Sequence, residues 1–453
     1  MDSISKFVEH VVGVDFIDLP QTIIDTTKNL LIDTIGVGIA GVDAPGCNEA
    51  LQLVKGWGGR KDATVLFQGF RCPAPWAAFV NSIAMHALDF DDTLDKSAHH
   101  ANVSVLPAAL AAAEVKGETS GRDLIVAVAL GHDISIRLAL SLTRPLAWTR
   151  AATCGFFGAT AAVGKILGLD RENLWNAFGL AYCQTAGNVQ GLVDGALSKR
   201  MQPAFAAKNA ILSSLLAEKG VTGPKNVLEG DYGFFKLYEH NDYDKNILLR
   251  NLGAEFTGEM LSTKPYPCCR MTHSSIDLAL SLRNSHNIDI NNVEKITVFC
   301  SKMVNNLVGQ RFELRDNYQT DAQFSIPYTV IIALIYGDVF LQHFETEFIK
   351  ENAILNLTER VQVVVDNNIE VKNMMKCSME VKTIQGDTYV AKTEATKGNP
   401  LNPMSTEECM DKFRKCASYG KNQLAPDRIS EILKALRNLE KIPDIRRLTS
   451  LLF

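Results

Sequence analysis

The hydrophobic pattern of this 453-residue chain changes near residue 266, and that change limits the folds open to it. Before that point apolar residues recur at helical spacing, as at Ile24, Leu31 and Ile35, and segments such as 74–88 are rich in alanine. The spacing predicts helices, and the small side chains predict that those helices pack closely. We therefore expect roughly the first 260 residues to be mostly helical.

The part of the chain after this point contains segments that alternate polar and apolar residues, as strands with one buried face do. The predicted strands are 293–300, 361–365, 377–383 and 388–396. Gly386-Asp387 is typical of a hairpin turn between the last two strands. The predicted helices of this part and of the C-terminal end are 322–336, 405–418 and 426–439.

This order of elements predicts a mainly α protein with an insertion. Residues 1–264, completed by 398–453, are expected to form a large all-helical domain built from both chain ends. Residues 265–397 are expected to form a smaller α/β lid domain. The chain length agrees with two or three domains.

Composition argues against several classes of protein. Hydrophobic residues make up 46% and charged residues 21%, the net charge is −5, and no block of like charge occurs, so we expect no nucleic-acid partner. The N-terminus lacks a basic start followed by an apolar run, and the longest apolar stretches are too short for a membrane span. The ten cysteines include no CxxC pair, which favours reduced thiols in a cytoplasmic protein.

The segment HALDFDDTLDKSAHH, His86 to His100, holds four carboxylates, three histidines and a threonine in fifteen residues. Three kinds of site compete for it: a metal site, a phosphatase nucleophile loop and a metal-free acid–base site. A fourth interpretation is structural: a helix cap with solvated carboxylates, in which Asp89 or Asp91 caps the next turn. For Asp92 and Asp95 taken singly, this interpretation is favoured.

The phosphatase interpretation rests on DxDxT at Asp89 to Thr93. Such a loop needs a buried strand before it, and the residues before Asp89 have helical spacing instead. A metal site is disfavoured because His99 and His100 are adjacent, so that their side chains diverge. We therefore expect no metal.

Two further motifs suggest nucleotide binding, but their context argues against it. Gly36 to Gly41 is a literal GxGxxG, yet it closes a helical pattern where a dinucleotide site needs a strand first. Helix packing and a helix stop explain it better. Ala159 to Lys165 resembles a phosphate loop but lacks its first glycine and its final serine or threonine.

Five segments together, in this order, resemble the MmgE/PrpD family, which includes 2-methylcitrate dehydratase, cis-aconitate decarboxylase and iminodisuccinate epimerase. The segments are His86–Thr93 with His99, Thr153–Ala159, Ser198–Ala207, Lys264–His273 and Ala322–Tyr328. The resemblance implies a helical domain with a smaller α/β lid domain, a homodimer, no metal or organic cofactor, and a small di- or tricarboxylate as substrate.

The resemblance also implies site residues. His99, Asp89, Lys199 and Tyr328 would be catalytic, and Thr93 and Lys264 would bind substrate. We add two further substrate-binding residues, Asp91 and, on chemical grounds, Arg270, since a guanidinium binds a carboxylate through two hydrogen bonds.

The chemistry shared by the family is proton movement at a carbon next to a carboxylate. His99 is the best acid–base candidate because an unperturbed histidine titrates near neutral pH. Asp89 orients it or acts as the base itself. The cations of Lys199, Lys264 and Arg270 would offset the substrate carboxylates and stabilise the enediolate that forms.

The sequence departs from the family pattern at two places. Decarboxylase-type relatives carry a histidine shortly before the Gly-rich segment, where this chain has Trp148-Thr149-Arg150; many dehydratases carry Lys-x-x-His, where it has Lys199-Arg-Met-Gln202. Both changes remove a proton carrier, and together they argue against decarboxylation in particular. The first hypothesis is a 2-methylcitrate-type dehydratase. The alternatives are an epimerase of an iminodisuccinate-like acid, a cis-aconitate-type decarboxylase, a catalytically silent binding protein and a Mg²⁺-dependent phosphatase.

Overall fold

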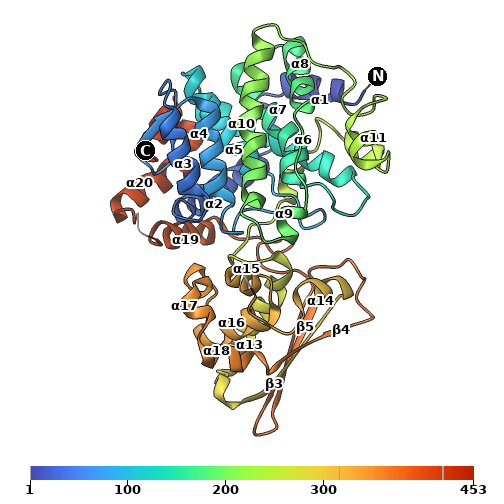
Figure 1. The fold of residues 1–453 in the computed structure, drawn as a ribbon, viewed down its shortest axis with the longest axis vertical. Helices are drawn as coiled ribbons and strands as arrows, with labels where there is room; N and C mark the ends of the chain where they lie inside the picture. The colour runs from blue at the N-terminus through green and yellow to red at the C-terminus, as the bar shows by residue number, and fades with distance from the viewer. Residues whose placement is uncertain (1, 316, 421–422) are drawn as a thin grey trace. The chain divides into compact units, whose positions relative to one another are not determined.

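The computed structural model describes residues 2–315, 317–420 and 423–453. The chain divides into two compact units. Unit 1 consists of the residues up to Thr263 and those from Ser405 onward, and unit 2 is Lys264–Met404. Figure 1 shows the elements of each unit.

Unit 1 is a bundle of helices with one short hairpin. Its helices are α1 (Ile4–Gly13), α2 (Gln21–Gly41), α3 (Cys47–Trp57), α4 (Ala74–His86), α5 (Asn102–Lys116), α6 (Gly121–Ser141), α7 (Arg150–Leu167), α8 (Arg171–Tyr182), α9 (Gln190–Val193), α10 (Ser198–Glu218), α11 (Phe234–Glu239), α12 (Lys245–Leu249), α19 (Thr406–Ala417), α20 (Pro426–Arg437) and α21 (Arg446–Leu451). The hairpin pairs β1 (Ala63–Val65) with β2 (Phe70–Cys72). Helix α7 packs against α5, α6 and α10, and the long helices stand side by side in Figure 1.

Helix α6 shows how local sequence sets these elements. The Ser120 hydroxyl accepts a hydrogen bond from the Asp123 N–H, and the Asp123 carboxylate accepts one from the Ser120 N–H, which forms a reciprocal cap at the start of the helix. Among the described residues, α6 alone is long and apolar enough to cross a membrane, and 94% of its apolar window is buried inside the unit. That burial is what a central core helix requires.

Two glycines of the GxGxxG motif lie in α2 at helix crossings. A Cβ on Gly36 would lie 3.0 Å from Phe413 of α19, and one on Gly41 would lie 2.0 Å from the carbonyl oxygen of Ala84 in α4. Neither distance leaves room for a side chain. The motif therefore serves helix packing, as its context in the sequence predicts.

The C-terminal helices return to the first helices of the chain, and α19 packs against α2. The buried Lys412 of α19 forms an ion pair with Asp33 at 2.7 Å and donates a hydrogen bond to the Phe90 carbonyl at 2.8 Å. Its ammonium group also lies 3.7 Å from the centre of the Phe90 ring. The last helices therefore hold the segment that follows α4.

Unit 2 is built on a four-stranded sheet with the order β4-β3-β5-β6. The strands are β3 (Val293–Cys300), β4 (Val361–Val365), β5 (Cys377–Thr383) and β6 (Thr388–Thr393). β4 runs parallel to β3, and β5 and β6 are antiparallel to their neighbours. The helices are α13 (His273–His286), α14 (Lys302–Val308), α15 (Tyr318–Gln323), α16 (Ile326–Tyr336), α17 (Thr346–Ile349) and α18 (Asn352–Thr358).

Buried and more exposed residues alternate along β3 and β5, so that one face of the sheet forms the core of unit 2. Helices α13 and α16 contact the sheet and contribute to this core (Figure 1). The architecture is mainly α with a small α/β part, which confirms the predicted fold class.

The structure corrects the prediction of a single helix at 322–336. The structure has α15 ending at Gln323 and α16 beginning at Ile326. The Ser325 hydroxyl accepts a hydrogen bond from the Tyr328 N–H, and Pro327 occupies the first turn of α16. Serine before a first-turn proline is a typical helix start, and here it outweighs the continuous apolar spacing.

Candidate functional site

The titratable segment forms the connection between α4, which ends at His86, and α5, which begins at Asn102. The DxDxT motif thus follows a helix, whereas a phosphatase nucleophile loop follows a strand. Asp89 and Ala98 have φ angles of 53° and 49°. Left-handed backbone at residues other than glycine costs on the order of 1–3 kcal/mol and is enriched at functional sites.

Asp91 is buried between two histidines. Its Oδ2 lies 2.9 Å from Nδ1 of His86 and 2.8 Å from Nδ1 of His100. Burial alone would raise the pKa of Asp91, but the two imidazoles hold it well below its ordinary value. Nδ1 of His100 also lies 2.8 Å from the carbonyl oxygen of Asp92. Asp91 therefore orients His86 and His100 through Oδ2, while its buried Oδ1 has no hydrogen-bond partner in the described part of the chain, and its substrate-binding role stays a prediction.

Asp92 caps helix α5, which confirms the structural interpretation for this residue. Its carboxyl group accepts hydrogen bonds from the N–H groups of Ala101 at 3.1 Å and Asn102 at 3.3 Å. Burial, together with the charge of Asp91, raises the pKa of Asp92 to about 8. Asp92 thus ties the loop to the start of helix α5.

Lys199, in the first turn of α10, reaches Asp89. The Lys199 Nζ lies 3.0 Å from the Asp89 Oδ1, and the two side chains are 24% and 13% exposed. The charge of Lys199 also helps to lower the pKa of His86. The structure thus brings together Lys199 and Asp89, two of the predicted catalytic residues, at the accessible edge of the loop.

His99 lies deeper in the same unit and is fully buried. Neither of its ring nitrogens has a hydrogen-bond partner in the described part of the chain. Burial lowers the pKa of His99 well below its ordinary value, and the charges of His100, Arg150 and His132 lower it further. The ring is therefore neutral at neutral pH and has both nitrogens unused, an arrangement that suits a base whose partner is a bound substrate.

Helix α7 packs against His99 through a glycine. A Cβ on Gly155 would lie 2.8 Å from the Ser104 hydroxyl and 3.7 Å from Cε1 of His99. The Gly-rich segment noted in the sequence therefore lets α7 approach the imidazole closely. Arg150, at the start of the same helix, donates a hydrogen bond to the Ser97 carbonyl at 2.8 Å and so fixes the loop two residues before His99.

Thr93 is fixed by its backbone. Its N–H donates to the Ser262 carbonyl at 2.9 Å, and its carbonyl accepts from the Ser262 N–H at 2.7 Å. The Ser262 hydroxyl donates to Asp95 at 2.6 Å. The side chain of Thr93 is almost fully buried, and its substrate-binding role stays a prediction.

Three predicted site residues belong to unit 2. Lys264 and Arg270 are buried, and Nη1 of Arg270 donates to the Lys397 carbonyl at 3.0 Å. Tyr328, in α16, is fully buried between the rings of Phe312 and Phe344. Its hydroxyl donates to a backbone carbonyl, that of His343. The roles assigned to these residues stay predictions.

One group in the described part of the chain has the composition of a metal site. Ligand atoms of His86, Asp91 and His100 lie within 4.8 Å of one another. The two separations between imidazole Nδ1 and the Asp91 oxygen, 2.9 and 2.8 Å, are ordinary hydrogen-bond lengths, so that hydrogen bonds account for the geometry without an ion. The expectation of no metal stays a prediction.

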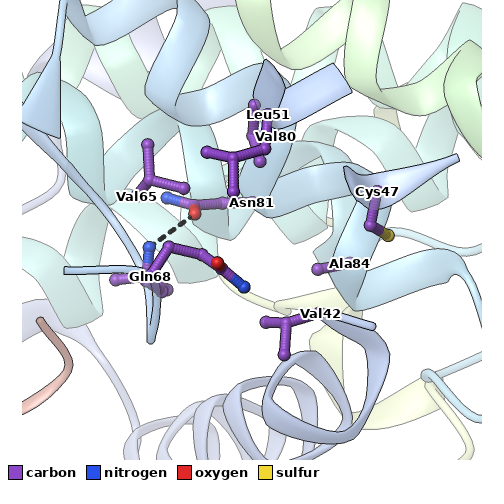
Figure 2. A pocket seen from close by; sticks show the side chains of 9 residues that line it. Val42, Cys47, Leu51, Val65, Gln68, Val80, Asn81 and Ala84 are labelled. Carbon is purple, nitrogen blue, oxygen red and sulfur yellow. Dashed lines mark hydrogen bonds between the residues drawn. The ribbon is translucent and has the colours of Figure 1, made fainter. Parts of the chain in front are cut away.

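A small cavity of about 10 Å³ lies elsewhere in unit 1 (Figure 2). Its lining is mostly aliphatic, with Asn81 accepting a hydrogen bond from the Leu66 N–H. Burial raises the pKa of its one thiol, Cys47, to about 12, so this cysteine is unreactive. A space of this size holds one water at most and is not a substrate site.

Three groups whose charges act on His99 are not among the predicted site residues: His100, Arg150 and His132. The sequence carried a signal for Arg150, because it stands just before the Gly-rich segment. His132 gave none, since its proximity depends on how α6 packs.

Comparison with known proteins covers nearly the whole chain. Residues 5–246 match the MmgE/PrpD N-terminal domain, and residues 266–438 match the MmgE/PrpD C-terminal domain. The cis-aconitate decarboxylase-like protein oryM of Aspergillus oryzae is 26% identical over 458 residues, which cover 96% of this chain and 94% of that protein. The cis-aconitate decarboxylase of Homo sapiens is 26% identical over 99% of this chain and 94% of its own length. The 2-methylcitrate dehydratase of Escherichia coli is 22% identical over 76% of this chain and 73% of its own length.

Proposed function

This chain belongs to the MmgE/PrpD family, and from that premise we propose that it is a lyase of the 2-methylcitrate dehydratase type. Its substrate would be a small hydroxy di- or tricarboxylate. The observation that carries the proposal is His99, a buried neutral imidazole with two unpartnered nitrogens. It lies in the same loop as Asp89, whose partner is Lys199.

The elimination follows from these groups. His99 removes the proton from the carbon next to a substrate carboxylate, and the electrons of that C–H bond enter an enediolate. The enediolate collapses to a C=C bond while the C–O bond of the neighbouring hydroxyl breaks. A general acid protonates the departing oxygen, which leaves as water. The ammonium of Lys199, with Asp89 beside it, is placed to stabilise the enediolate charge.

Decarboxylation of a cis-aconitate-like acid is the second candidate. It is favoured by the similarity to proteins named cis-aconitate decarboxylase, which match 96–99% of this chain. Decarboxylation, however, leaves a carbanion that must receive a proton. The site offers a neutral His99 beside Arg150, whose guanidinium does not release its proton. Elimination and epimerisation also need a proton donor, so the argument against decarboxylation rests on the histidine that this chain lacks at 148–150.

Proton NMR in D₂O with EDTA tests the proposal directly. The substrates 2-methylcitrate, citrate, cis-aconitate and iminodisuccinate are offered separately. A new vinyl signal from a hydroxy acid is the expected result. Release of CO₂ from cis-aconitate would replace the dehydratase by the decarboxylase, and deuterium exchange without elimination would replace it by the epimerase. No reaction with any of these acids would favour the catalytically silent member.

The same assay tests the absence of a metal. We expect the turnover rate to be unchanged after dialysis against EDTA. Loss of activity that Mg²⁺ or Zn²⁺ restores would assign an ion to His86, Asp91 and His100 and would contradict the metal-free proposal.

A homodimer is the expected assembly. It is supported by an exposed aromatic cluster on unit 1, in which Trp57 and Phe205 are 54% and 47% exposed. Trp57 contacts Trp76, and Phe205 contacts Phe79. Light scattering should give twice the 49.8 kDa chain mass, and Phe205→Ser should shift it toward the monomer. A monomeric wild-type protein would contradict the proposal.

A further inference from the structure

We infer that Arg150 binds one carboxylate of the substrate, in addition to the negative charge that Lys199 stabilises. Arg150 therefore selects for acids that carry an additional carboxylate. The inference rests on the proposed function, because it names a recognition element of the same site. Arg150 is not among the predicted site residues, and its signal in the sequence is its place just before the Gly-rich segment.

The first argument is that the guanidinium of Arg150 forms no ion pair with an anionic group among the described residues. The side chain of Arg150 is 8% exposed, and its two hydrogen bonds go to neutral groups, the carbonyls of Ser97 at 2.8 Å and Arg144 at 3.4 Å. Among the described residues, no carboxylate forms an ion pair with Arg150. Buried cations normally have an anionic partner, because taking a charge out of water is costly. A bound substrate carboxylate would supply one.

The charge of Arg150 acts on the carboxyl group of Glu239, but the two side chains form no ion pair in the described part of the chain. Burial raises the pKa of Glu239, and the charge of Arg150 opposes that rise without reversing it. A direct ion pair would hold the pKa of a carboxyl group below its ordinary value. Glu239 therefore lies within electrostatic reach of Arg150 but forms no ion pair with it in the described part of the chain.

The second argument is position. Arg150 is the first residue of α7, an 18-residue helix, and the N–H groups of a first helical turn carry positive partial charge. Gly155, one turn further along, lies against Cε1 of His99. The charge of Arg150 is also one of the causes that lower the pKa of His99. The guanidinium, the helix start and the unpartnered imidazole thus lie in one neighbourhood.

The chemistry explains why a carboxylate suits this place. A guanidinium presents a planar fork of donors that matches the two oxygens of a carboxylate. A carboxylate bound there would neutralise Arg150 and remove its effect on His99, which raises the basicity of the imidazole when substrate is present. Recognition and activation of the base would then be one event.

Binding of inert acids tests this without requiring turnover. Propane-1,2,3-tricarboxylate and pentanedioate, which lacks the middle carboxylate, are titrated by calorimetry into wild-type protein, Arg150→Gln, Arg150→Lys and Arg144→Gln. Arg144 is an exposed neighbouring cation, so its variant controls for net charge. Circular dichroism and thermal unfolding establish that each variant is folded.

We expect Arg150→Gln to weaken the tricarboxylate by roughly 10- to 100-fold and the dicarboxylate by less than threefold. Arg150→Lys should recover part of the loss, and Arg144→Gln should bind both acids as wild type does. Equal weakening of both acids would overturn the inference in favour of a positioning role through Ser97. Unchanged affinities in Arg150→Gln would also overturn it.

The binding experiment and the turnover assay distinguish failure of this inference from failure of the proposed function. A wild-type protein that binds the tricarboxylate in an Arg150-dependent manner but eliminates nothing from the hydroxy acids upholds the inference and refutes the dehydratase. A wild-type protein that binds neither acid overturns the inference together with the proposed substrate class.

Discussion

His99 in unit 1 and Tyr328 in unit 2 are both fully buried polar side chains, and the resemblance assigns a catalytic role to each. Their surroundings differ. Tyr328 gives its hydroxyl to the carbonyl of His343 and packs between two phenylalanine rings. His99 has two nitrogens without a partner among the described residues. A satisfied buried group stabilises a fold, whereas an unsatisfied one costs stability and persists where function needs it.

The largest expected effect is the loss of activity when His99 is replaced. His99→Asn should lower kcat about a thousandfold, because it removes the general base and keeps a polar side chain. The control is His286→Gln, an exposed histidine of α13, which should leave kcat unchanged. A folded His99→Asn enzyme with wild-type kcat would refute the assignment.

The next effect concerns the accessible edge of the loop. Lys199→Met should lower kcat/KM about a hundredfold, since the cation that stabilises the enediolate is lost and Asp89 loses its partner. Lys219→Met, at the C-terminal end of the same helix and exposed, is the matched control. Equal activities of the two variants in steady-state kinetics would show that Lys199 is only a surface lysine.

The pH dependence of stability sharpens the comparison, because His132 is a buried neighbour of His99. Burial lowers the pKa of His132 to about 3, so the folded protein binds fewer protons there than the unfolded chain between pH 3 and 6.5. Stability contributed by this group is therefore present above pH 6.5 and is lost as pH falls. Asp92, with its pKa raised to about 8, acts in the opposite direction.

Comparing His132→Gln with wild type cancels the effect of Asp92. Glutamine can keep the hydrogen bond that His132 makes with Asn102 at 2.9 Å. Relative to wild type, the variant should gain about 1.4 kcal/mol in unfolding free energy between pH 7.5 and 5.5. Denaturant titrations at the two pH values measure this difference. A difference that does not change with pH would mean that burial does not lower the pKa of His132 and that the group titrates alike in the folded and unfolded states.

The smallest expected effect is that of replacing Tyr328. Tyr328→Phe should cost about 1–2 kcal/mol in stability, because the carbonyl of His343 loses its donor. Its effect on kcat tests the predicted catalytic role separately. Thermal unfolding and steady-state kinetics measure the two quantities. A large loss of kcat with normal stability would make Tyr328 catalytic and would end the contrast with His99.

Much of the fold was predictable because it depends on local pattern. Strands β3, β4 and β5 have the predicted bounds. Alternation and capping act over a few residues and can be read directly. The break before α16 also had a local signal, Ser325 with Pro327, which the apolar spacing concealed.

The surroundings of the candidate site were less predictable, because they depend on contacts between distant segments. The place of Asp91 between His86 and His100 depends on how the loop turns back, which the sequence does not indicate. Nothing near Arg150 in the sequence indicates that it meets the Ser97 carbonyl, 53 positions away. Local pattern names the residues of a site; only packing determines which of them are left without partners.

The bond from Lys412 to the carbonyl of Phe90 joins residues 322 positions apart and has a consequence for biosynthesis. Phe90 leaves the ribosome long before Lys412 is made, whereas unit 2 is one continuous stretch of chain. Unit 2 can therefore fold during translation, while the loop between Asp89 and Asp91 waits for the last helices. A nascent chain that stops before α19 has every predicted site residue and lacks the lysine that holds that loop in place.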